Sequence, residues 1–285
     1  MTGVLAAFAG VLGALVGSFL NVVIHRLPRG ERFGMSRSHC PKCGALIRWF
    51  DNVPILSFLW LLGRCRSCRA RISVRYPIVE IATATLFSLS FLRAVDLEWE
   101  PVLLGFATAA GFAAVVVAAA FIDLQHKILP DRLTLRAGPV FGLIASVGVP
   151  GIHGLSFFGV DLSGTMKPGL GSLVVGLLGA VAGGGVILLL RQVGTWIARR
   201  EAMGLGDVKF MAMCGLLLGP GPVLMAIWAA ILLAAVIGVA IWAITRSREI
   251  PFGPFLGLGA LATLYAGDAI ETLLLRDLPA LLRGE

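Results

Sequence analysis

The sequence predicts an all-α polytopic membrane protein, with about eight transmembrane helices and a small cytoplasmic, zinc-ribbon-like domain inserted after the first helix. Composition is the first reason: 58% of the 285 residues are hydrophobic and only 14% are charged. A soluble protein of this size needs many more charged side chains on its surface. Disordered chains, collagens, disulfide-rich secreted modules and ordinary cytosolic enzymes are therefore excluded. The other reasons are a series of apolar runs and two CxxC motifs.

The apolar runs mark the expected helices in chain order. A helix needs about 20 mostly apolar residues to cross a bilayer. The segments that approach this requirement cover residues 3–24, 77–95, 101–122, 133–150, 169–190, 207–219, 222–245 and 253–273. The sixth is short and begins in a Gly-rich stretch, so we expect it to be tilted, or joined to the seventh through the Gly219-Pro220-Gly221-Pro222 turn.

The basic residues predict the orientation of these helices. If the amino terminus lies outside, 20 of the 24 Lys and Arg residues fall in segments on the inside, and eleven of them lie in residues 25–76. This asymmetry follows the positive-inside rule. Membrane topology therefore explains the net charge of +8, and no nucleic acid partner is predicted.

The chain accordingly divides into four parts. We expect a first transmembrane helix over residues 1–24, a cytoplasmic cysteine-bearing domain over 25–76, a membrane domain over 77–275 and a carboxy-terminal tail over 276–285. No positive charge precedes the apolar stretch of the first helix, so we predict that this helix is retained and is not a cleaved signal peptide.

Four of the five cysteines form a pattern typical of a metal site. Cys40 and Cys43 form one CxxC pair, Cys65 and Cys68 form another, and 21 residues separate the pairs. This spacing is close to that of a zinc ribbon, in which four thiolates hold a structural Zn²⁺ ion. Free or redox-active thiols are the alternative, whereas a catalytic zinc is disfavoured because four cysteines leave no open ligand position. Cys214 lies in an apolar run and is expected to be a buried apolar residue.

Two aspartates stand at the predicted inner ends of helices. Asp123 closes the third apolar run, and Asp207 opens the sixth within Gly204-Leu205-Gly206-Asp207. Both are expected at the cytoplasmic face, where helix packing could bring their carboxyls together. Two carboxyls in contact share a proton, and such a pair can activate water for peptide hydrolysis without a metal. Gly204 and Gly206 would let an extended peptide approach the backbone closely.

The same acidic residues also have structural interpretations. Asp207 would serve as a helix cap, and Asp123 would pair with Lys127 or Arg132. Glu80, near the inner end of the second run, would pair with Arg75 or contribute to a substrate site. Placement alone leaves these alternatives open.

Several motifs together resemble the type IV prepilin peptidase family, the membrane-embedded GxGD aspartyl proteases. These motifs run from residue 17 to residue 255, so the resemblance covers nearly the whole chain. Besides the two CxxC pairs, they are Gly17-Ser18-Phe19-Leu20-Asn21, Asp51-Asn52-Val53-Pro54-Ile55, Arg75-Tyr76-Pro77-Ile78-Val79-Glu80, Phe121-Ile122-Asp123-Leu124, Gly204-Leu205-Gly206-Asp207-Val208-Lys209 and Ile250-Pro251-Phe252-Gly253-Pro254-Phe255. His25 departs from the family, where many relatives carry an aromatic residue.

The resemblance implies a bifunctional enzyme of the prokaryotic inner membrane. Asp123 and Asp207 would be the catalytic pair that cleaves the leader of type IV prepilins, or of type II secretion pseudopilins, after a glycine at the cytoplasmic face. The cysteine-bearing domain implies N-methylation of the new amino terminus with S-adenosylmethionine as methyl donor. No GxGxxG cofactor loop is present, and no residues are predicted to bind the methyl donor.

Two functions of other classes remain as alternatives. In a transporter or channel, Asp123 and Asp207 would relay protons or bind a cation, although such a site is expected nearer the middle of the membrane. In a pilus or secretion assembly scaffold without peptidase activity, the cysteine domain would recruit other components of the machine. Substitution of Asp207 discriminates between these functions and the enzyme.

Overall fold

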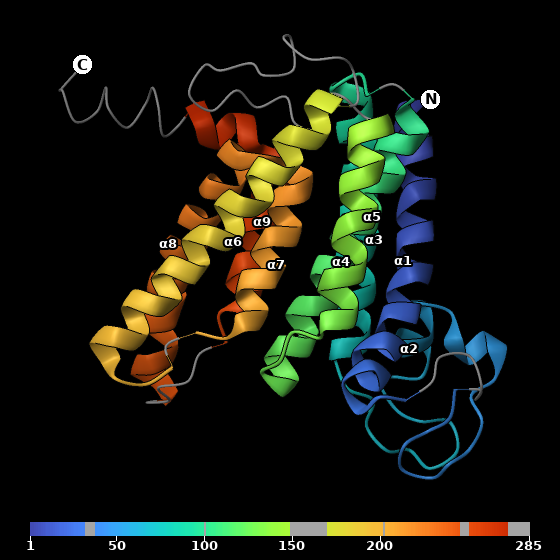
Figure 1. The fold of residues 1–285 in the computed structure, drawn as a ribbon. Coiled ribbons are helices and arrows are strands. Elements are labelled where there is room, and N and C mark those ends of the chain that lie inside the picture. The colour runs from blue at the N-terminus through green and yellow to red at the C-terminus, as the bar shows by residue number, and fades with distance from the viewer. Residues whose placement is uncertain (32–37, 100, 149–169, 202, 246–250, 273–285) are drawn as a thin grey trace, which may run out of the picture.

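A computed structural model describes residues 1–31, 38–99, 101–148, 170–201, 203–245 and 251–272 (Figure 1). Every regular element in these ranges is a helix, apart from two isolated β-bridges in the cysteine-bearing segment. The long helices are α1 (Thr2–Arg26), α3 (Arg75–Asp96), α4 (Val102–His126), α5 (Asp131–Gly148), α6 (Leu170–Ala198), α7 (Leu205–Leu218), α8 (Pro220–Thr245) and α9 (Gly253–Thr272). Each coincides with one predicted apolar segment, so the all-α class is confirmed.

Five segments are long and apolar enough to cross a membrane: Thr2–Arg29, Arg75–Asp96, Val102–His126, Gly171–Ala198 and Pro220–Gly238. The chain is therefore a multi-pass membrane protein. Helix α7 has only 14 residues, which is short for a membrane span. It joins α8 through Gly219, whose positive φ of 84° is easily adopted by glycine. The turn expected between the sixth and seventh segments is thus present.

Small residues let the helices approach one another closely. Helix α1 packs along α3, and a Cβ atom at Gly17 would lie only 2.8 Å from the Cα of Glu80. Helices α6 and α7 meet in the same way, where Gly179 and Gly215 leave no room for a side chain between the backbones. Such contacts replace the hydrophobic driving force that membrane helices lack among themselves.

Helix α4 lies at the centre of the bundle and contacts α1, α3, α5 and α9. Phe112 and Ile122 on this helix are completely buried. Figure 1 shows that α4 ends, and α7 begins, at the end of the bundle from which the cysteine domain extends. Asp123 and Asp207 are consequently carried to the same end of the molecule.

The cysteine domain is built mainly from loops between α1 and α3 (Figure 1). Its short helical elements are η1 (Leu27–Arg29), η2 (Trp49–Asn52) and α2 (Leu56–Trp60). The domain has few regular backbone hydrogen bonds and little buried apolar surface. Small domains of this kind are often stabilised by a bound metal ion.

Candidate active site and cysteine cluster

Asp123 lies in the last turn of α4, which runs on to His126 and so extends past the predicted limit of 122. The residue is only 7% exposed. Its Oδ2 accepts a hydrogen bond of 3.1 Å from the backbone N–H of Gly253, the first residue of α9. The carboxylate is therefore held in place by the amino terminus of a helix that is distant in the sequence.

Asp207 is the third residue of α7 and is also buried. Its carboxylate accepts a hydrogen bond from the backbone N–H of Gly204, which is the N-cap residue of the helix. Asp207 is thus not the cap itself, but it satisfies one of the backbone donors left free at the helix start. The expectation that Asp207 caps the helix is therefore wrong, because Gly204 is the N-cap residue. The bond to Gly204 does not conflict with a catalytic role of Asp207.

Neighbouring contacts fix the start of α7. Lys209 donates a hydrogen bond of 2.7 Å from Nζ to Oδ1 of Asp131, the first residue of α5. A Cβ atom at Gly206 would lie 2.9 Å from the Cβ of Leu129, so the connection between α4 and α5 packs directly against this glycine. Gly206 is needed for this close approach, and the contact places α7 beside the end of α4.

The two aspartates predicted from the sequence are close enough to interact electrostatically. Sequence reasoning did not assign a role to Gly253, although the residue lies in one of the motifs used for the resemblance. A signal was available, because Gly253-Pro254 follows Pro251 and opens an apolar run, as expected for the start of a helix. A pair of buried carboxylates held by backbone N–H groups is suited to acid–base chemistry on a polar substrate.

The four cysteines of the two CxxC pairs come together as predicted. Their Sγ atoms all lie within 4.8 Å of one another, and those of Cys40 and Cys68 are 3.9 Å apart. A tetrahedral zinc ion with Zn–S bonds of about 2.3 Å requires sulfur–sulfur distances of about 3.8 Å. The donor set and its spacing therefore fit a four-thiolate metal site.

The two CxxC pairs form backbone loops of the same design. In each loop the backbone carbonyl of the first cysteine accepts a hydrogen bond from the backbone N–H four residues later. The backbone N–H of the same cysteine donates to the carbonyl oxygen five residues later. An isolated β-bridge closes each loop, between His39 and Leu46 and between Arg64 and Arg71. The residue after each pair, Gly44 or Arg69, has a positive φ. This repeated geometry turns two sulfurs from each loop toward the other pair.

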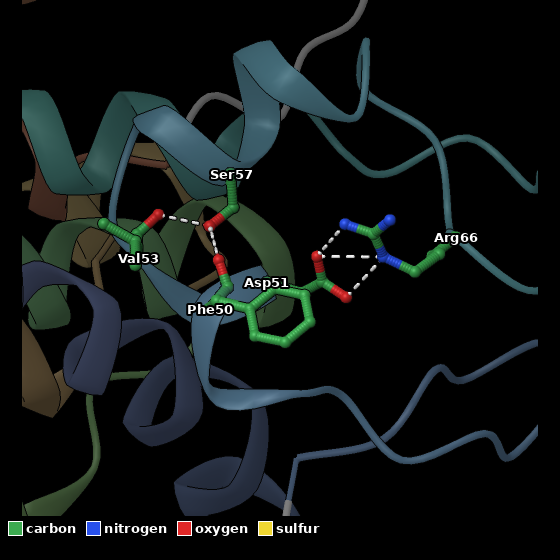
Figure 2. A network of polar contacts seen from close by, with 5 residues as sticks. All are labelled: Phe50, Asp51, Val53, Ser57 and Arg66. Atoms are coloured by element: carbon green, nitrogen blue, oxygen red, sulfur yellow. Dashed lines mark hydrogen bonds and ion pairs between the residues drawn. The ribbon is translucent and has the colours of Figure 1, made fainter.

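An ion pair connects the second loop to the segment between the pairs. Figure 2 shows the carboxylate of Asp51 facing the guanidinium of Arg66, with Nε 2.8 Å from Oδ2 and Nη2 2.5 Å from Oδ1. The hydrogen bonds from Arg66 lower the pKa of Asp51. Beside it, the hydroxyl of Ser57 donates to the carbonyl oxygen of Val53 at 2.5 Å. Since Arg66 lies between Cys65 and Cys68, this ion pair orients the second CxxC loop.

Glu80 connects the same segment to the membrane helices. Its side chain on α3 is buried, and Oε2 accepts a hydrogen bond of 2.7 Å from the backbone N–H of Ile55. The hydroxyl of Ser18 on α1 donates to the same carboxylate. Arg75, one of the basic residues near Glu80 in the sequence, donates instead to Oε1 of Gln125 at 2.5 Å.

These features define a multi-pass helical membrane protein with an inserted four-cysteine domain and a pair of buried aspartates at the same end of the bundle. The chain belongs to the type IV leader peptidase family. The Type IV leader peptidase family matches residues 110–239. The Bacterial Peptidase A24 N-terminal domain matches residues 11–94. The resemblance noted in the sequence is thereby confirmed.

Several curated relatives align over nearly the whole chain. The chain is 35% identical to a prepilin leader peptidase/N-methyltransferase of Aeromonas salmonicida, over 90% of this chain and 89% of the relative. It is 36% identical to a protein of the same name from Burkholderia pseudomallei, over 96% and 89%. It is 34% identical to a type 4 prepilin-like proteins leader peptide-processing enzyme of Escherichia coli, over 90% and 92%. No solved structure matches the chain significantly.

Proposed function

We propose that the chain is a bifunctional membrane enzyme that removes the leader peptide from type IV prepilins or pseudopilins and then N-methylates the new amino terminus. The observation that carries the peptidase is that two buried aspartates from distant helices, Asp123 and Asp207, lie near enough to interact electrostatically. Membership of the leader peptidase family and the names of the aligned relatives support the same pair of activities.

In the proposed reaction, one ionised carboxylate accepts a proton from a water molecule, whose oxygen attacks the carbonyl carbon of the scissile bond. The other aspartate, protonated, donates a hydrogen bond to the carbonyl oxygen. Collapse of the tetrahedral intermediate breaks the C–N bond, and the departing amine takes up a proton from the pair. The backbone bonds from Gly253 to Asp123 and from Gly204 to Asp207 would hold the two carboxyls in position throughout.

The four-cysteine cluster is proposed to hold a structural Zn²⁺ ion through Cys40, Cys43, Cys65 and Cys68, because the sulfur spacing fits a tetrahedral thiolate site. The ion would fold the cysteine domain and take no part in hydrolysis. S-adenosylmethionine would supply the methyl group for the second activity. No residues in the described part of the chain are assigned to that donor, so methyl transfer is not divided into steps.

We further propose that the active site faces the cytoplasm from the prokaryotic inner membrane. The distribution of Lys and Arg supports this orientation, which places the cysteine domain of residues 25–76 and both aspartates inside. The proposed peptidase domain comprises residues 77–275. Prepilins or pseudopilins would dock their hydrophobic stalk among the helices and the surrounding lipid, while their leader reaches the aspartates. Components of the pilus or type II secretion machine are further candidate partners.

The test is mass spectrometry of the amino terminus of a co-expressed prepilin. With the wild-type enzyme we expect the leader to be removed after glycine and a methyl group to be added. Asp207→Ala should slow leader removal at least about a hundredfold, because one partner of the acid–base pair is lost. Asp96→Ala is the matched control, since Asp96 is an exposed carboxylate at the end of α3 and has no part in the site.

The outcomes separate the functions. Cleavage without methylation by the wild-type enzyme would keep the peptidase and discard the transferase. An untouched prepilin beside a well-folded enzyme would favour the transporter or the scaffold. If Asp207→Ala processed the prepilin as fast as Asp96→Ala, Asp207 would have no part in the mechanism.

A further inference from the structure

Helix α2 lies at the depth where membrane helices begin. Its N-cap residue, Ile55, is hydrogen-bonded to Glu80, which is five residues into α3 and so about 7.5 Å along that helix. The same carboxylate is bonded to Ser18, which lies well inside α1. The start of α2 is therefore held beside segments of α1 and α3 that are apolar enough to cross a membrane.

One face of α2 is apolar and uncovered. Leu56, Leu59 and Trp60 have the i, i+3, i+4 spacing that places residues on one side of a helix, and their exposed fractions are 61%, 62% and 79%. Trp49 on the neighbouring element η2 is 81% exposed. Large apolar side chains at this exposure, gathered on adjoining elements, are uncommon unless a membrane or another molecule covers them.

The surroundings of this face are basic. Residues 38–74 contain six Lys or Arg residues and a single acid, Asp51, which is already paired with Arg66. The guanidinium carbon of Arg48 lies 5.8 Å from the ring centre of Phe50, and that ring packs edge-on against Trp49. Positive charge therefore adjoins the exposed aromatic side chains directly.

We propose that α2, together with Trp49, is an interfacial anchor that inserts its apolar face into the leaflet from which the cysteine domain extends. Tryptophan is enriched at the membrane–water interface, and helices that lie in this plane turn their apolar side toward the acyl chains. Arg48 and the other basic residues would contact anionic lipid headgroups. The anchor would restrict the cysteine domain to the membrane surface, beside the aspartates. It does not depend on the proposed enzymatic function.

The test uses the full-length protein in vesicles of equal parts phosphatidylcholine and phosphatidylglycerol. Tryptophan emission is measured with lipids brominated either near the headgroup or near the end of the acyl chain, for the wild type and Trp60→Phe. The difference between the two proteins gives the emission of Trp60. We expect lipids brominated near the headgroup to quench the Trp60 emission at least twofold more than lipids brominated near the end of the acyl chain. Trp99→Phe is the control, because Trp99 is 3% exposed within the protein and its difference emission should resist both lipids.

Trp60 emission that resists both brominated lipids and is quenched by aqueous iodide would overturn the proposal. Emission that resists both lipids and changes with protein density in the vesicle would instead assign the face to a second copy of the chain. Unchanged quenching after replacement of phosphatidylglycerol by phosphatidylcholine would remove the contribution of anionic headgroups. Trp49→Phe repeats the measurement at the neighbouring element and guards against a local effect of the first substitution.

Discussion

The buried carboxylate of Glu80 on α3 accepts a hydrogen bond from the backbone N–H of Ile55 in the cysteine domain. Ile55 has φ 63° and ψ −54°, a conformation that β-branched residues rarely adopt. Such backbone strain costs on the order of 1–3 kcal/mol and persists only where the surroundings enforce it. Here the Glu80 carboxylate holds the Ile55 backbone, and Ser18 on a second membrane helix holds that carboxylate. The cysteine domain is thus attached to the bundle by a specific polar contact in addition to its two chain connections.

Glu80→Ala is expected to destabilise this attachment by about 1–3 kcal/mol, because the amide of Ile55 would lose its acceptor. Glu80→Gln keeps an acceptor oxygen and should cost less. The measurement is the thermal unfolding midpoint in detergent, combined with the rate of proteolysis within residues 38–74. Glu31→Ala, at an exposed position, is the control and should change stability by less than about 0.5 kcal/mol. Equal stability of Glu80→Ala and the control would show that the contact does not hold the domain.

Gly253→Ala should disable the peptidase while leaving the bundle folded. A Cβ atom at this position would lie 2.6 Å from Oδ2 and 3.0 Å from Cγ of Asp123, so the carboxylate would have to move. A displacement of about 1 Å in a catalytic group can reduce the rate about a hundredfold. The measurement is the initial rate of leader removal from a purified prepilin, with circular dichroism to monitor folding.

Gly185→Ala provides the matched control for this substitution. Gly185 lies on α6, and a Cβ atom there would meet no atom within 4 Å. We expect normal cleavage, with stability unchanged or slightly increased, because alanine favours helix over glycine. A Gly253→Ala enzyme as active as Gly185→Ala would mean that the position of Asp123 is not critical for cleavage.

The helices could be predicted because a residue that is buried or in contact with lipid is usually apolar. A run of such residues therefore marks a helix without knowledge of the rest of the fold. The run at residues 101–122 gave the third helix, and α4 extends it by one further turn to His126. That last turn contains Asp123, where a polar residue ended the apolar pattern although the helix continued. Hydropathy therefore locates helices well but misses helical turns that carry polar residues such as Asp123.

The contacts that complete the site were harder to predict, since they join residues far apart in the chain. The sequence indicated Asp123 and Asp207 individually, but the bond from Gly253 to Asp123 spans 130 residues and depends on the packing of α9 against α4. The CxxC pairs were predictable because their ligand spacing is a local geometric requirement. Glu80 was noted for its position, whereas its partner Ile55 contributes only a backbone N–H and so leaves no mark in the sequence.

Zinc removal should separate the two proposed activities. Cys40→Ser or Cys65→Ser removes one ligand of the four, and we expect loss of bound zinc together with lower abundance or lower methylation. Leader removal should persist in chelator, because the proposed hydrolysis uses carboxylates and no metal. The measurements are elemental analysis of the purified protein and mass spectrometry of the processed prepilin. Cys214→Ala is the control, since Cys214 is buried within α7 and its loss should leave the zinc content unchanged.

Normal methylation by a zinc-free variant with serine at all four positions would contradict a structural role for the ion. Loss of leader removal in chelator, with the protein still folded, would instead indicate a metal in the peptidase itself.

The Asp51–Arg66 pair should stabilise the cysteine domain in a pH-dependent way. Arg66 is 40% exposed, so we expect a double-mutant cycle with Asp51→Asn and Arg66→Gln to give only a small favourable coupling at neutral pH. Because Arg66 lowers the pKa of Asp51 in the folded state, this coupling should hold down to the unfolded value, at about pH 4, and disappear as the pH falls through the lowered one. The cycle is read from thermal unfolding at each pH, in the presence and in the absence of added zinc. A coupling that is absent at neutral pH, or that increases on acidification, would exclude an ionised Asp51 as the partner of Arg66.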